Sequence, residues 1–128
     1  MSRDDPAPFI VLIERWAEWA GDDPAAAEDE LRELSIDMRA ADGFTRRTRT
    51  VTFDRDVQAV ERALAALKAQ AEGTRLQDLV LRVHLRHERP EQIARDLELH
   101  PAEVDEALLR AWAFLRDEIP RQWRGLPG

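Results

Sequence analysis

Residues 89–111, RPEQIARDLELHPAEVDEALLRA, hold the side chains whose types and spacing best suit the binding of a nucleic acid. Two short helical patterns meet at Glu98-Leu99, and a proline stands at the first position of each pattern, at Pro90 and Pro101. The chemistry on offer is hydrogen bonding, since guanidinium groups bind phosphates and carboxylates accept from the N4 amino group of cytosine. This layout predicts a helix-turn-helix whose second helix enters a DNA major groove.

The expected DNA contacts combine arginines with the exposed side chains that open the second helix of the motif. They are Arg46, Arg47, Arg49, Arg95, His100, Ala102, Glu103, Asp105, Glu106 and Arg110. The acidic members of this set repel phosphate, so the arginines have to offset them. A helical bundle that binds protein and does not read DNA is therefore the open alternative.

Two positions of the motif depart from its common form. Glu98 occupies the turn position that usually carries glycine, which predicts a non-glycine residue in the left-handed region. His100 stands at the N-cap of the second helix, where serine or threonine is the stronger cap. The small Ala94 should let the two helices cross closely, with Leu99 filling the corner between them.

The elements that position the motif are predicted to be helical. The chain has no Tyr and only five Gly among 128 residues, and it is rich in Ala, Leu and Arg, which favours a compact all-α fold. Apolar residues recur at helical spacing. The expected helices run over about 8–20, from 24 to before Gly43, over 55–71, over 75–87, and through the helix-turn-helix to Ile119 before Pro120. The expected N-caps are Asp23, Asp54 and Thr74.

The chain divides into four parts on this pattern. Residues 1–43 form an N-terminal helical segment, and residues 54–120 form the helix-turn-helix domain. Between them, residues 44–53, FTRRTRTVTF, are basic and rich in threonine, which predicts an extended arm or hinge. Residues 121–128, RQWRGLPG, are expected to be a tail.

The charge balance limits the classes of partner. The formal net charge is −7, from 26 acidic and 19 basic residues, and most of the acidic excess lies in the N-terminal part. A strong non-specific nucleic-acid binder is excluded by this balance, so any DNA contact must come from a local basic patch. The chain has no Cys, hence no disulfide framework and no thiolate chemistry. We expect no signal peptide and no membrane-spanning segment.

Tryptophans are the candidate contacts to a protein partner. Trp16 and Trp19 fall on the apolar stripe of the first helix and on its edge, so core packing competes with partner binding. Trp123 lies in the expected tail with nothing local to bury it, which makes it the better candidate. In the last helix, Trp112 and Phe114 straddle the apolar face, so one should be buried and the other exposed.

Metal binding and catalysis are not expected. His84 and His87 lie on one helix, with Glu91 beyond them, but zinc sites need more convergent ligands. No glycine-rich phosphate loop is present, and Ser2 and Ser35 are the only serines, so no serine elbow can be built. The sequence thus predicts a non-enzyme without cofactor or metal.

The order of these segments resembles a known family. The layout of helix, helix and helix-turn-helix over 54–120 is similar to the DNA-binding region four of bacterial sigma factors. The stretch VLIERWAEWA at 11–20 resembles the opening of the phage late-gene antiterminators of the Q family, in the branch with a sigma-like helix-turn-helix. ALLRAWAFLRDEI at 107–119 resembles the aromatic helix that ends such proteins.

The resemblance implies a function. Such proteins bind a DNA element at a late promoter, join a paused RNA polymerase, travel with it and narrow its RNA exit channel, so that terminator hairpins cannot form. It implies double-stranded DNA, the host RNA polymerase and sigma factor as partners, in the cytoplasm of a bacterial host, and a homodimer on DNA stays open. By position, the helix-turn-helix carries DNA recognition, while Trp16, Trp19 and the middle face the polymerase. Two alternatives remain, a helical module that binds polymerase or sigma without reading DNA, and a plain helix-turn-helix regulator.

Overall fold

The computed structural model describes residues 6–39 and 54–126, and these residues fold into helices joined by short turns, without a strand. In chain order the elements are α1 (Phe9–Ala20), α2 (Pro24–Arg39), α3 (Arg55–Lys68), α4 (Gly73–Val80), the π-helical turn η1 (Leu81–Leu85), α5 (Pro90–Leu97) and α6 (Pro101–Gly125). The all-α expectation is confirmed. Within the described ranges, no helix combines the length and the apolar character needed to cross a membrane.

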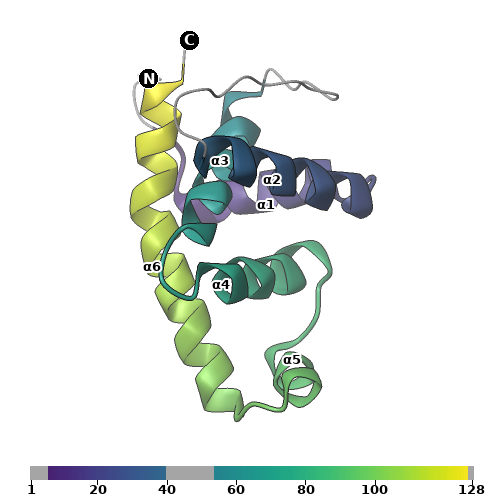
Figure 1. Cartoon of the computed structure of the whole chain (residues 1–128). Coiled ribbons are helices and arrows are strands. Elements are labelled where there is room, and N and C mark those ends of the chain that lie inside the picture. The colour runs from purple at the N-terminus through teal and green to yellow at the C-terminus, as the bar shows by residue number, and fades with distance from the viewer. Residues whose placement is uncertain (1–5, 40–53, 127–128) are drawn as a thin grey trace.

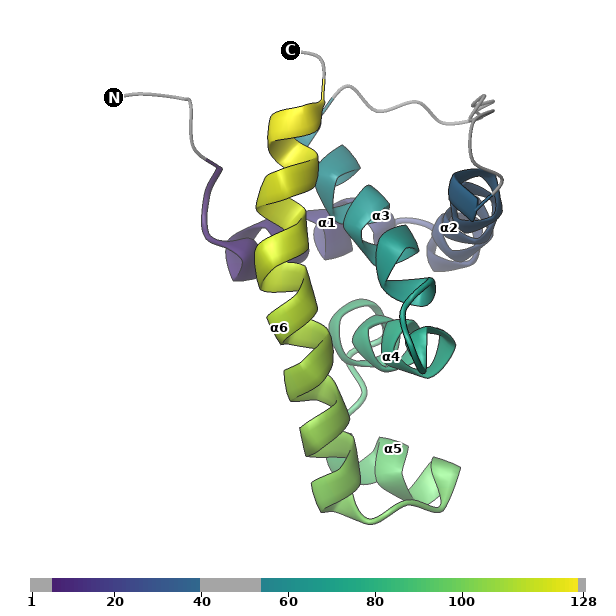
Figure 2. The ribbon, with the colours of Figure 1, turned by 60° about the vertical axis from the view of Figure 1, so that its left-hand side comes forward.

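The long α6 runs along one side of the molecule, and the other helices are stacked beside it (Figures 1 and 2). The N-terminal helices lie near its C-terminal end, α4 near its middle and α5 near its N-terminal end. Helix α3 is the centre of the core, because it contacts α1, α2, α4 and α6. Its buried residues are Val57, Ala59, Val60, Ala63, Leu64, Ala65 and Leu67.

Two of the expected N-caps are confirmed. The Asp54 carboxylate accepts hydrogen bonds from the backbone N–H groups of Asp56 and Val57, at 2.9 and 3.3 Å. The Asp23 carboxylate accepts from the N–H of Ala26 at 3.2 Å. Each cap satisfies backbone donors that the first turn of a helix leaves unpaired, which fixes where α2 and α3 begin.

The third expected cap, Thr74, is wrong, because α4 already begins at Gly73, after Glu72 in the left-handed region at φ 58°. The preceding helix was expected over 55–71 and ends at Lys68. A Cβ on Gly73 would lie 2.3 Å from the backbone oxygen of Leu67, so only glycine fits where α4 turns off α3. The close approach of two backbones, and not helix termination, explains this glycine.

The C-terminal boundary also differs from the prediction, since α6 passes through Pro120 and continues to Gly125. A proline inside a helix costs about 3 kcal/mol, because it lacks the N–H and crowds the preceding turn. The last turn offsets this by burying Trp123 and Leu126. In addition, the Arg55 guanidinium donates to the backbone oxygens of Trp123 and Leu126, at 2.9 and 3.3 Å. Residues 121–126 are therefore part of the fold and not a tail.

Trp112 and Phe114 correct a further expectation, since both are partly buried and neither is the exposed member of a pair. The indole N–H of Trp112 donates to Nε2 of His84 at 3.0 Å, with the two rings edge to face. This contact joins α6 to η1. A second link joins this region to α2. The Arg86 guanidinium, just after η1, binds both carboxylate oxygens of Glu28 on α2.

Candidate nucleic-acid interface

The turn between α5 and α6 has a defined hydrogen-bonded geometry. The N–H of Leu99 donates to the oxygen of Ala94 at 2.8 Å, and the N–H of Glu98 donates to the oxygen of Arg95 at 3.2 Å. This pair of bonds is the Schellman arrangement, which needs a left-handed residue at its corner. Glu98 takes that role at φ 57° and ψ 44°, as its position in the sequence predicted. Ala94 is buried at the crossing, as its size indicated.

The first turn of α6 is closed by a reciprocal pair of hydrogen bonds. Nδ1 of His100 accepts from the N–H of Ala102 at 3.1 Å, and the Glu103 carboxylate accepts from the N–H of His100 at 2.9 Å. This is a capping box, so His100 caps its helix well despite its residue type. Two of the expected base-contacting side chains thus also hold the start of the helix, through Nδ1 of His100 and one carboxylate oxygen of Glu103.

The outward face of α6 beyond the cap is acidic with an apolar centre. Ala102, Asp105, Glu106 and Arg110 are all exposed, and Leu109 between them is 63% exposed. The Arg110 guanidinium lies 3.4 Å from the Glu72 carboxylate, with more than half of each side chain in solvent. An exposed pair of this kind contributes little, so Arg110 can turn to another anion.

The arginines around the hairpin differ in how they are held. Arg82 is mostly buried and bound to Asp78 and Glu88, so it stabilises the fold. Arg95 on α5 is exposed, as is Arg89 immediately before it, and neither has an ion pair within the described part of the chain. The sequence pattern did not single out Arg89, which is the N-cap residue of α5.

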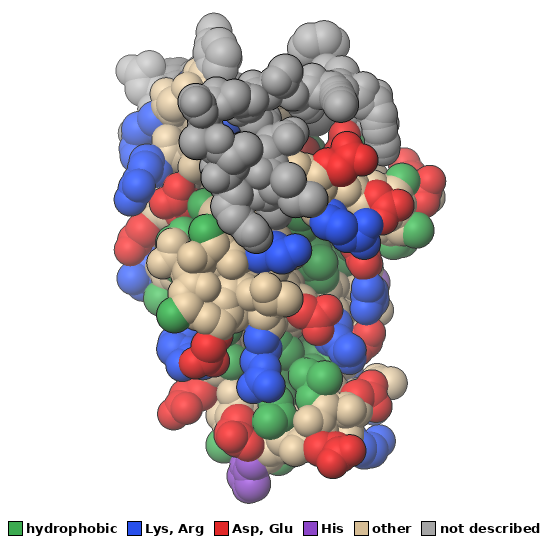
Figure 3. Space-filling model, in the orientation of Figure 1, with side chains coloured by type: hydrophobic (Ala, Val, Ile, Leu, Met, Phe, Trp, Pro, Cys, Tyr) green, Lys and Arg blue, Asp and Glu red, His purple; other side chains and the backbone are tan. Residues whose placement is uncertain are grey.

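Basic and acidic side chains alternate across the face seen in Figure 3, and the coloured residues of that face form no continuous basic patch. The expected arm arginines, Arg46, Arg47 and Arg49, lie outside the described residues. The expected DNA contacts that are described and lie outside the capping box are all exposed on α5 and α6. They are Arg95, Ala102, Asp105, Glu106 and Arg110.

The candidate partner tryptophans separate into two buried residues and one accessible residue. Trp16 is 1% exposed and belongs to the core. Trp123 is 8% exposed, with its indole N–H bound to the Asp56 carboxylate at 2.9 Å and the Arg55 guanidinium 4.1 Å above its ring. The expectation that nothing buries Trp123 is wrong, because the continued α6 brings it onto α3. Only Trp19 remains partly exposed, in a hollow between α1 and α2.

The two histidines near η1 line another open hollow, of about 440 Å³, together with Glu14 and Glu18 of α1. Within the described residues, no three histidine or acidic side chains are arranged so that they could hold a metal ion. Burial lowers the pKa of His84 below its ordinary value of 6.5; the nearby Glu14 opposes this and the nearby His87 adds to it. The indole N–H of Trp112 donates to Nε2 of His84, so this nitrogen carries no proton, which agrees with the lowered pKa.

Comparison of the chain with protein-family models, with curated proteins and with solved structures finds no match.

Proposed function

We propose that the chain is a transcription antiterminator of the phage late-gene type, which holds DNA through α5 and α6 and RNA polymerase through other surfaces. The observation that supports this most is the hairpin of α5 and α6. A Schellman turn and a capping box fix its corner, and the first turns of α6 present an exposed face. A helix held in this way can be offered to a major groove without a change of shape.

Contact with DNA would be limited in strength by the charges of the hairpin. Arg95 and Arg110 are the cations that can reach phosphates beside α6, with Arg89 as a third. Asp105 and Glu106 can accept from cytosine N4 but repel the backbone. With about three to five phosphates neutralised, the logarithm of the binding constant should fall against that of the salt concentration with a slope of about −3 to −4.

A second candidate function is a helical module that binds RNA polymerase or sigma factor without reading DNA. It is favoured by the outward face of α6, where exposed Leu109 lies among carboxylates. An apolar side chain with an acidic rim suits a protein surface with a basic rim better than it suits a duplex.

A gel-shift titration with late-promoter DNA at two salt concentrations tests the proposal. The double variant Arg95→Glu/Arg110→Glu should lose binding, whereas Arg32→Glu/Arg116→Glu, an equal charge change outside the hairpin, should change it little. Absence of binding by the parent chain at low salt would favour the protein-binding module. Transcription past a strong terminator then separates an antiterminator, which raises readthrough, from a plain regulator, which changes initiation only.

A further inference from the structure

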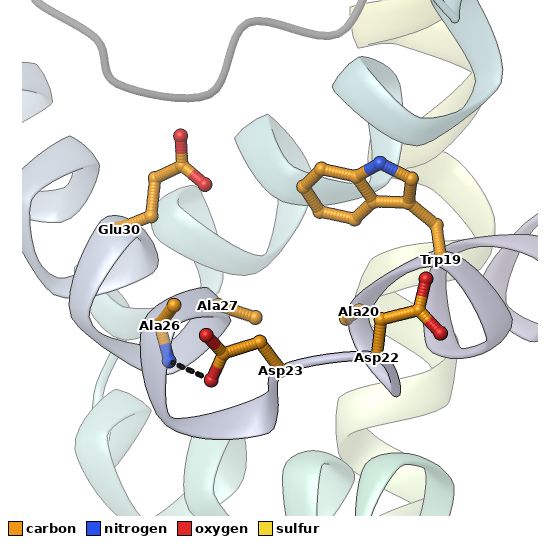
Figure 4. A pocket seen from close by; sticks show the side chains of 7 residues that line it. All are labelled: Trp19, Ala20, Asp22, Asp23, Ala26, Ala27 and Glu30. Atoms are coloured by element: carbon orange, nitrogen blue, oxygen red, sulfur yellow. Dashed lines mark hydrogen bonds between the residues drawn. The ribbon is translucent and has the colours of Figure 1, made fainter.

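A hollow of about 280 Å³ opens between the end of α1 and the start of α2 (Figure 4). Its lining residues are Trp19, Ala20, Asp22, Asp23, Ala26, Ala27 and Glu30. In Figure 4 the Trp19 indole and the Glu30 carboxylate lie on opposite sides of the hollow, with alanines between them. Small-molecule sites generally occupy about 300 to 1,000 Å³, so this hollow is of the size that one long side chain fills.

The charged residues that line the hollow are all acidic. The Asp23 carboxylate is used as the cap of α2, but Asp22 is exposed and has no ion pair within the described residues. The last turn of α1 carries no basic residue, although the carbonyl end of a helix favours one. Glu30 of α2 adds a further carboxylate to the lining. These carboxylates favour a cation over an anionic group such as a phosphate.

Trp19 gives the hollow an aromatic wall. A guanidinium over an indole gains electrostatic attraction to the ring, and its planar fork also matches a carboxylate. The chain itself contains this arrangement, because the Arg55 guanidinium lies 4.1 Å above the ring of Trp123. Alanine methyl groups suit the apolar stem of an arginine, so the aromatic, apolar and acidic parts of the hollow match one side chain.

We propose that this hollow receives an arginine side chain from a basic segment of a protein partner. The inference deepens the proposed function, on which it rests for the existence of a protein partner, and it names the chemistry of that partner. Its test uses neither DNA nor transcription, so the two proposals can fail separately.

The probe is an acetylated, amidated tetra-arginine peptide, titrated into the full chain while the indole N–H signals of the tryptophans are followed by NMR. The Trp19 signal should shift more than those of buried Trp16 and Trp123. Trp19→Leu should weaken binding about two- to fivefold, which is the worth of a cation–π contact. Asp22→Asn should weaken it too, while Glu91→Gln, the same charge change on exposed α5, should alter it less than either.

Thermal unfolding of each variant shows whether its fold is intact. Equal losses for Asp22→Asn and Glu91→Gln would mean binding by net charge alone, and would overturn the proposal. So would a Trp19 signal that does not move. The arm of this chain is the competing occupant. If Arg46→Ser/Arg47→Ser/Arg49→Ser shifts the Trp19 signal without peptide and strengthens peptide binding, this chain itself fills the hollow, and the proposal of a partner's arginine is overturned.

Discussion

Replacing Trp123 tests whether the last turn of α6 belongs to the cooperative fold. The side chain is 8% exposed, and its indole N–H lies 2.9 Å from the Asp56 carboxylate. Trp123→Ala should lower the free energy of unfolding by about 3 to 5 kcal/mol, the usual cost of removing a buried aromatic residue. Trp123→Phe keeps most of the ring packing and loses the hydrogen bond. It should therefore cost about 1 to 2 kcal/mol.

Urea unfolding followed by circular dichroism measures these differences, and Arg116→Ala on the same helix is the control. Arg116 and its ion-pair partner Asp117 are both exposed, so removal of Arg116 should change the free energy of unfolding by less than about 0.5 kcal/mol. A double-mutant cycle of Arg55→Ala with Trp123→Phe reports the coupling between the guanidinium and the last turn. If Trp123→Ala costs less than about 1 kcal/mol, Trp123 does not hold α6 on α3 and the reasoning fails.

Three further results are expected. Glu98→Gly should raise the free energy of unfolding by about 0.5 to 1 kcal/mol in urea titrations, because glycine removes the left-handed penalty but loses more entropy on folding; a loss of stability would contradict the strain. The lowered pKa of His84 means that the unfolded chain takes up a proton first as pH falls below 6.5, so the melting temperature should drop until the folded-state pKa is passed; His84→Gln should flatten this dependence, and an unchanged slope would refute it. Arg86→Ala should cost at most about 1 kcal/mol, since its pair with Glu28 is partly in solvent, and less in 1 M salt; a cost that salt does not reduce would mean packing, not charge, holds α2 there.

The sequence predicted several helix caps and the turn of the hairpin, because these features depend on residues that are close together in the chain. Asp23 and Asp54 are caps in both the sequence pattern and the structure, and the left-handed Glu98 follows from the spacing of the two helices around it. Capping and turn chemistry depend on neighbours within a few residues, which one sequence displays.

Features that depend on distant contacts were not predictable. Nothing near Pro120 in the chain shows that Arg55 binds the last turn, and nothing near Gly73 shows how closely α4 approaches α3. The burial of Trp123 has the same origin. At the candidate interface the exposed residues of α6 followed from periodicity, but the capping box that joins Glu103 to the His100 backbone was not expected.

The single helix α6 extends from the hairpin at one end of the molecule to the packing around α1 and α3 at the other (Figure 2). Its 25 residues form one continuous helix of about 37 Å. On the proposed function, the hairpin end of α6 holds the DNA groove and the other end holds RNA polymerase. The rotation of the DNA relative to the polymerase is then fixed by the helix. The DNA element and the paused polymerase would then have to lie on matching sides of the duplex. Five inserted base pairs should abolish loading, and about ten should restore it.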